Sequence, residues 1–144
     1  MNRITAARER LDHASDLPAV LDAACEAFHA IIAVLRQHQE DAPEAFPAFV
    51  IAAGAAGNGR DWIASAPSLP PDDLRAAPAD AGGLMPGQPW PHVALEVADL
   101  SHRLASRLTQ FADQAADPDD QASCGHAAAY ARRIHGLLAG APQP

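Results

Sequence analysis

Two pairs of acidic and histidine side chains have a spacing that could hold a metal ion. Glu26 stands three residues before His29, and Asp99 stands three residues before His102. On a helix, residues three apart lie on one face. Carboxylate and imidazole groups both bind divalent transition metals. Two such pairs on facing helices would make a metal centre between them.

This acid-x-x-His spacing resembles the ligand pattern of ferritin-like di-metal proteins, in which such pairs project inward from long helices. The second pair departs from that pattern, because it has Asp where the pattern has Glu. At about 100° per residue, both pairs also fall outside the apolar stripes of their helices. We therefore expect these side chains on solvated helix faces, and no metal or other cofactor.

The two cysteines belong to a second candidate metal set. Cys25 lies four residues before His29, and Cys124 and His126 lie near the start of another helix. Zinc accepts a set of two cysteines and two histidines. However, side chains two apart on a helix point about 200° away from each other. Both cysteines border apolar stripes, which favours buried free thiols.

Arg8 and His13 fit a loose Arg-x(4–6)-His pattern. This segment resembles the motif of the HEPN helical ribonucleases, and the resemblance would imply RNA cleavage at these two residues. The match covers only this short N-terminal segment, which is not where that family carries its motif. The sequence has no Gly-x-Ser-x-Gly and no phosphate-cradling glycine loop. We expect a protein without enzymatic activity.

Five further residues flank a Pro/Gly-rich stretch. Arg60, Asp61 and Trp62 precede it, and Trp90 and His92 follow it. If the stretch folds back, these side chains would line one ligand pocket with an aromatic wall and an arginine for an anion. Alternatively, both tryptophans anchor the stretch, and Arg60 and Asp61 form a solvated or capping pair.

Amphipathic helices would carry all of these residues. The clearest apolar stripe lies in a helix predicted over about 91–115, and similar patterns predict helices over about 2–13, 17–40 and 118–139. Runs of alternating apolar and polar residues are absent, which argues against a sheet. The sequence predicts an all-α fold: a single-domain antiparallel bundle of about five helices over 1–139, with a long Pro/Gly-rich loop over 67–91 and a flexible tail over 140–144. The members of that clearest stripe are Val93, Val97, Leu100, Leu104, Leu108 and Phe111.

The remaining helix is predicted to start with Asp41 as its N-cap, and it is apolar nearly all round. Gly54 and Gly57 each weaken its helicity by about 1 kcal/mol relative to Ala. They would let a neighbouring helix approach closely. Gly57-Asn58-Gly59 could end the helix, but the helical spacing of Trp62 and Ile63 favours its continuation through this segment.

Such a helix is difficult to cover within one small bundle, so part of its apolar surface is expected to be exposed. We expect a homodimer or a protein partner there. Alternatively, the long loop covers this helix with Leu84, Met85 and Trp90 and leaves a monomer. The interface residues would be Phe46, Phe49, Val50 and Ile51.

The composition limits the partners. The chain of 144 residues has a net charge of −8, which disfavours binding to nucleic acid. All its basic residues are Arg, which is typical of GC-rich, actinobacterial-type coding. We see neither a signal peptide nor an apolar run of about 20 residues that could span a membrane.

The sequence therefore predicts a cytoplasmic, non-enzymatic helical module for protein interaction or oligomerisation. The alternative is a small-molecule-binding or metal-dependent helical protein that uses a cleft between Trp62 and Trp90, or the histidines.

Overall fold

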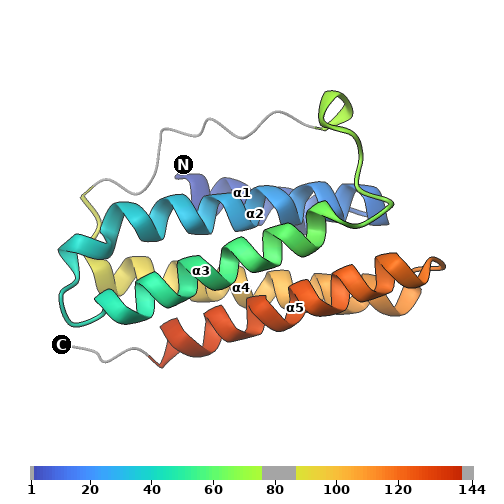
Figure 1. The fold of residues 1–144 in the computed structure, drawn as a ribbon. Helices are drawn as coiled ribbons and strands as arrows, with labels where there is room; N and C mark the ends of the chain where they lie inside the picture. Colours follow the sequence, from blue (N-terminus) through green and yellow to red (C-terminus); the bar gives the residue numbers. More distant parts are fainter. Residues whose placement is uncertain (1, 76–86, 141–144) are drawn as a thin grey trace.

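The computed structural model describes residues 2–75 and 87–140, and across them the chain is all-helical (Figure 1). It has five α-helices and two short 3-10 helices, and no strand occurs in these ranges. This confirms the predicted all-α class and the number of helices. The elements are α1 (Arg3–His13), α2 (Leu17–His38), η1 (Gln39–Asp41), α3 (Phe46–Ala64), η2 (Asp72–Leu74), α4 (Trp90–Gln114) and α5 (Pro118–Ala139).

The four long helices surround a shared core. α2 packs against α3, α3 against α5, α5 against α4, and α4 against α2, while α1 lies across α2 and α4. α2 and α3 run in opposite directions, as do α4 and α5 (Figure 1). α3 and α4 run in the same direction, so the connection between them starts at one end of the helices and finishes at the other.

The core is built from many alanines and a few large side chains, Phe28, Phe49 and Leu104 among them. All members of the stripe predicted on α4 are buried. α3 continues through Gly57–Gly59, as its spacing predicts. The close helix approach, however, occurs at Gly59 and not at Gly54 or Gly57: a Cβ on Gly59 would lie 2.5 Å from Cζ of Phe28.

Glu26 does not lie on a solvated face, contrary to the expectation from its helix alone. Its side chain is only 8% exposed, because α1 packs over that side of α2. Arg3 Nε donates to Glu26 Oε1 at 3.2 Å, and Arg10 pairs with Asp22 at 3.4 Å. The charges on this face of α2 therefore attach α1.

The predicted start of α3 at Asp41 is wrong. Asp41 ends the η1 turn, with its carboxylate 3.8 Å from Nδ1 of His38, and α3 begins only after Ala45. Pro47 lies in the first turn of α3, where a missing N–H costs nothing. The preceding helix, α2, is capped by Asp16, whose side chain accepts from the N–H of Ala19.

Part of the predicted 67–91 loop lies within the described residues. The N–H and Oγ of Ser68 donate to the carboxylate of Asp120 at 2.9 and 2.5 Å, and Leu69 packs against the core. The loop is thus joined to the start of α5. Leu84 and Met85, which could cover α3, lie outside the described residues.

One segment, Leu17–Asp41, is long and apolar enough to cross a membrane by length and composition, with a mean hydropathy of 1.6. From the sequence, no such segment was expected. In the structure, 67% of its most apolar window is buried among the other helices. Buried core helices commonly pass the same test.

Candidate interaction surface

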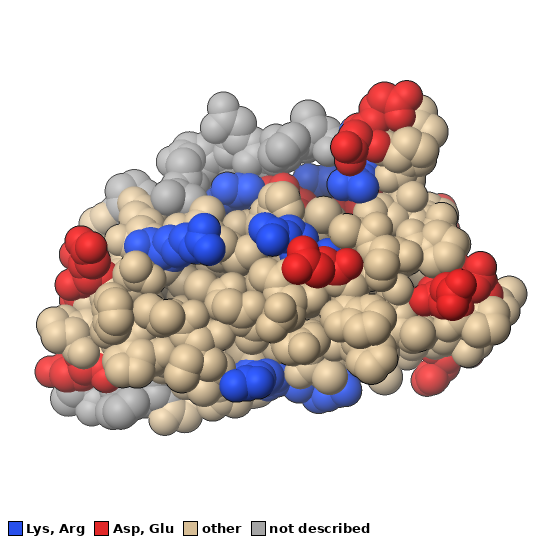
Figure 2. Space-filling view, in the orientation of Figure 1, with Lys and Arg blue, Asp and Glu red and all other residues tan. Residues whose placement is uncertain are grey.

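The outward side of α3 carries exposed apolar side chains. Phe46 and Val50 are each 43% exposed and Ile51 is 45% exposed. Figure 2 shows this side of the molecule as a broad area with few charged side chains. We call it the α3 outer face, and define it by Phe46, Pro47, Val50, Ile51, Gly54, Gly57 and Asn58, which are exposed or half-buried.

The local sequence of α3 produces two different apolar sides. Its buried, inward side consists of alanines, Gly59, Phe49 and Ile63. Phe49 is fully buried and its ring lies edge-on to Trp90, with 6.4 Å between ring centroids. Three of the four residues predicted for an interface therefore lie on the outer face, and Phe49 lies in the core.

Within the described residues, the two glycines of the outer face have open space at their Cβ positions. A Cβ added to Gly54 or to Gly57 would meet no atom within 4 Å. Each glycine weakens the helix by about 1 kcal/mol relative to Ala. Gly125 and Gly136 of α5 are equally open, so open space alone marks no contact. On the α3 outer face it lies beside the exposed Phe46 and Val50 and leaves room for close approach from outside.

Within the described residues, the two tryptophans predicted to line one cleft pack against different partners. Trp62 stacks on His126 of α5, with ring centroids 4.1 Å apart. Trp90 packs on Phe49 instead. At about 1.5 Å per residue, Phe49 and Trp62 are about 20 Å apart along α3. Trp90, which contacts Phe49, therefore packs near one end of α3, and Trp62 lies near the other end.

The other residues predicted for that cleft also separate. Arg60 and Asp61 pair with each other at 3.5 Å beside Trp62. His92 lies on α4 near Trp90, with Nε2 3.9 Å from Oε1 of Glu96. A pocket of about 190 Å³ does form at Trp62. It is lined by Asn58, Asp61, Trp62, Ser65 and Tyr130.

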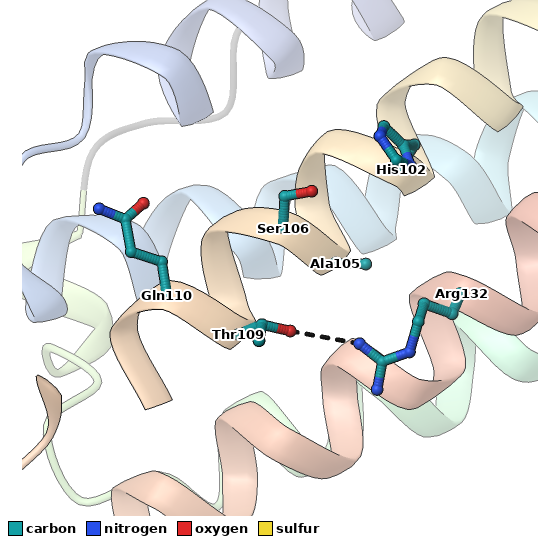
Figure 3. A pocket seen from close by; sticks show the side chains of 6 residues that line it. All are labelled: His102, Ala105, Ser106, Thr109, Gln110 and Arg132. Carbon is teal, nitrogen blue, oxygen red and sulfur yellow. Dashed lines mark hydrogen bonds between the residues drawn. The ribbon is translucent and has the colours of Figure 1, made fainter. Parts of the chain in front are cut away.

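A second pocket, of about 410 Å³, lies between α4 and α5 (Figure 3). Arg132 Nη1 donates to Thr109 Oγ1 across it at 3.2 Å. This pocket was not predicted from the sequence, although polar residues recur at helical spacing along that side of α4. The lining residues are His102, Ala105, Ser106, Thr109, Gln110 and Arg132.

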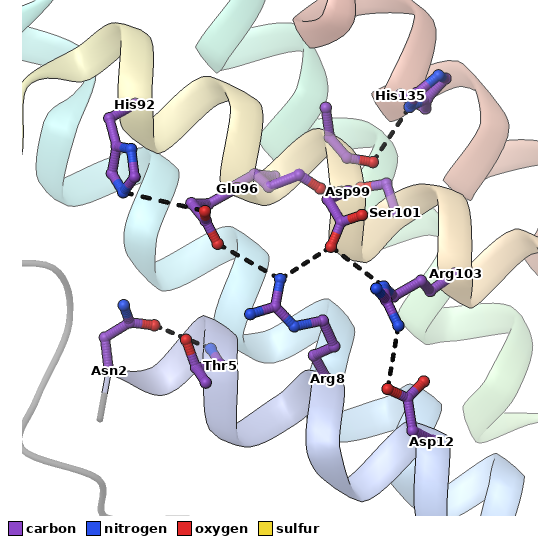
Figure 4. A network of polar contacts seen from close by, with 12 residues as sticks. Asn2, Thr5, Arg8, Asp12, His92, Glu96, Asp99, Ser101, Arg103 and His135 are labelled. Atoms are coloured by element: carbon purple, nitrogen blue, oxygen red, sulfur yellow. Dashed lines mark hydrogen bonds and ion pairs between the residues drawn. The ribbon is translucent and has the colours of Figure 1, made fainter.

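Arg8, one of the two residues of the ribonuclease-like pattern, joins α1 to α4 (Figure 4). Its Nη1 lies 2.8 Å from Asp99 Oδ2 and 3.5 Å from Glu96 Oε2. Arg103 bridges Asp99 and Asp12, at 3.1 Å to each. Partial burial raises the pKa of Asp99, but the hydrogen bonds and charges of Arg8 and Arg103 outweigh it and hold that pKa below its ordinary value.

His13, the other residue of that pattern, does not meet Arg8. Its Nδ1 lies 2.7 Å from the carbonyl oxygen of Glu9 in its own helix. The pattern therefore has no shared site in the structure. The Asp99–His102 pair is separated similarly, since Asp99 binds arginines and His102 lies beside His135, with ring centroids 5.3 Å apart.

The two cysteines are buried and free. Burial raises the pKa of Cys25, and burial together with the charge of Asp120 raises the pKa of Cys124 to about 11. His29 is exposed beside Cys25, while His126 stacks on Trp62. In the described part of the chain, no three His, Cys, Asp or Glu side chains gather as a metal site.

No protein-family model matches this chain, and neither a curated protein nor a solved structure matches it. We therefore infer its function from its own residues.

Proposed function

We propose that the protein is a non-enzymatic cytoplasmic module that forms a homodimer through the α3 outer face. In this proposal, residues 1–139 form one antiparallel bundle domain, with the 67–91 loop as its long connection. The exposure of Phe46, Val50 and Ile51 on a surface with few charged side chains carries the proposal. The net charge of −8 argues against nucleic acid as the partner.

The driving force would be apolar burial. Removing apolar surface from water contributes about 25 cal/mol per Å². Monomeric proteins rarely expose large contiguous apolar patches, and two-fold dimers are the commonest way to bury them. Repulsion between two acidic copies opposes the contact, but salt screens charges beyond about 8–10 Å and leaves apolar contact intact.

A second candidate function is small-molecule binding at the Trp62 pocket. The observation that favours it is the convergence of Asp61, Trp62 and Tyr130 around about 190 Å³. An aromatic wall beside a carboxylate suits a cationic or aromatic ligand. This pocket does not require Phe46 or Val50, so variants of those residues separate the two functions.

Sedimentation at micromolar concentrations in moderate salt tests the dimer. We expect a species of twice the 15.0 kDa chain mass, and expect Val50→Ser to shift it toward the monomer. Leu95→Ser is the matched control, because Leu95 is 51% exposed on α4, outside this face. A species near 15.0 kDa at every concentration would reject the dimer.

A further inference from the structure

We infer that α3 pairs with α3 of a second copy in an antiparallel two-fold contact centred at the level of Ala52. Phe46 and Val50 of each copy then rest on Gly57 and Gly54 of the other. This inference rests on the proposed homodimer and specifies its geometry.

The α3 outer face has a bulky half and a glycine half. Phe46, Val50 and Ile51 project from the first half of this face, over 46–51, and Gly54 and Gly57 follow in its second half. A bulky side chain fits best where the opposing helix has none. The face is therefore complementary to itself when the second copy is reversed.

A two-fold axis makes the matching positions symmetric about one point of the helix. The point midway between Val50 and Gly54 is position 52, and the point midway between Phe46 and Gly57 is half a residue away. The pairs Val50–Gly54 and Phe46–Gly57 thus place the two-fold axis at the same level of the helix, to within half a residue. A parallel pairing would place Phe46 against Phe46 and leave the glycines facing each other.

The glycines have the space that this contact needs. Among residues 2–75 and 87–140, no atom would lie within 4 Å of a Cβ at either position, which leaves room there for the partner's side chains. Interaxial distances between packed helices depend on the side chains at the contact. Glycine at the crossing allows the closest approach.

Opposite charges lie at the two ends of the face, together with the acid Asp61, which is 72% exposed. Glu44 precedes α3, and Arg60 lies near its C-terminal end. With the axis at position 52, Glu44 of one copy is level with Arg60 of the other, twice per dimer. Arg60 already pairs with Asp61 at 3.5 Å, and it retains donors for a second carboxylate.

Crosslinking with a short bis-maleimide tests the register. In the full chain and the proposed register, Ile51→Cys places the thiols of the two copies about 3 Å apart in the direction of the helix. Asn58→Cys places them about 18 Å apart in the same direction. Both positions are exposed, and the native Cys25 and Cys124 are buried. We expect covalent dimers from Ile51→Cys and none from Asn58→Cys or from the unmodified chain.

Each other outcome overturns a distinct part of the inference. Crosslinking at both positions would show a parallel pair. No crosslinking at Ile51→Cys, in a protein that sediments as a dimer, would reject this register and leave the proposed homodimer standing. A protein that sediments as a monomer at every concentration would reject the homodimer itself.

Gly54→Gln tests the glycine half without endangering the fold, because Gln is a good helix former and the site is open. We expect association to weaken by at least about tenfold, with an unchanged or higher Tm measured at concentrations where the protein is monomeric. Gly136→Gln on α5 is the matched control, since Gly136 is also exposed with no atom near its Cβ position. Equal association of Gly54→Gln and the unmodified chain would overturn the contact.

Discussion

The ring of Phe28 occupies the space that a side chain on Gly59 would need. Three ring carbons of Phe28 lie 2.5, 2.6 and 3.1 Å from the position of a Cβ on Gly59. Phe28 is itself fully buried, so its ring has little room to move away. The contact sets how closely α2 and α3 approach each other.

We expect Gly59→Ala to destabilise the protein by about 1–3 kcal/mol, because the new methyl group forces Phe28 or the helices to shift. Urea unfolding of the monomeric protein, followed by circular dichroism, measures the change. Unchanged stability would mean that the ring can rotate away without loss.

The same substitution should have the opposite sign at Gly54. Its Cβ site is open, and Ala is favoured over Gly in a helix by about 1 kcal/mol. We expect Gly54→Ala to raise the free energy of unfolding by about 0.5–1 kcal/mol. A loss of stability in the same unfolding assay would contradict the open site that the structure shows at Gly54.

Leu104 and His102 occupy opposite sides of α4. Leu104 is fully buried, and we expect Leu104→Ala to cost about 2–4 kcal/mol through lost burial and a cavity. His102 is exposed, so His102→Ala should stay within about 0.5 kcal/mol. Equal losses in denaturant unfolding would contradict the register of α4.

The lowered pKa of Asp99 makes the attachment of α1 sensitive to acid. Because the pKa is lower in the folded protein than in the unfolded chain, the stabilisation is present above the unfolded value of about 3.9 and is lost as the pH falls through the folded value. Asp99 is half exposed, so solvent reduces the effect. We expect Asp99→Asn to be less stable than the unmodified protein near pH 6, with the difference shrinking below about pH 4.

Chemical unfolding of both proteins between pH 3 and pH 6 measures that difference. Glu40→Gln is a suitable control, because Glu40 is an exposed acid in η1, away from α1. A difference between Asp99→Asn and the unmodified protein that stays constant over this pH range would contradict the role of the Asp99 carboxylate.

Both thiols should react slowly while the protein is folded. The thiolate is the reactive form, and burial raises the pKa of both Cys25 and Cys124. We expect slow modification by a maleimide at pH 7 and rapid modification in guanidinium chloride. Peptide mass spectrometry identifies the modified residue, and fast native labelling of Cys124 would show that α5 opens locally.

The sequence predicted most reliably those elements whose apolar residues form one narrow stripe. The stripe on α4, from Val93 to Phe111, is buried throughout, and α5 has the predicted bounds of 118–139. In these helices, a local period separates the inward from the outward side. The same rule was insufficient for Glu26, whose burial depends on α1, a separate segment.

The candidate surface was predicted in part for the same reason. α3 is apolar on both sides, so its period could not show that Phe49 points inward while Val50 points outward. The choice of Gly59 over Gly54 as the close contact depends on Phe28 in another helix. The stacking of Trp62 on His126 likewise depends on how α3 meets α5, which no local pattern contains.

The order of helix contacts also determines when the core can be completed during synthesis. α2 and α3 form one hairpin and α4 and α5 form another, and each hairpin supplies one side of the contacts α2–α4 and α3–α5. A ribosome releases α1 and the α2–α3 hairpin first, before α4 and α5, which cover the inward side of that hairpin, have been made. Nascent chains stalled before residue 90 should therefore expose apolar surface and attract chaperones, whereas chains released beyond residue 139 should bury it by docking two preformed hairpins.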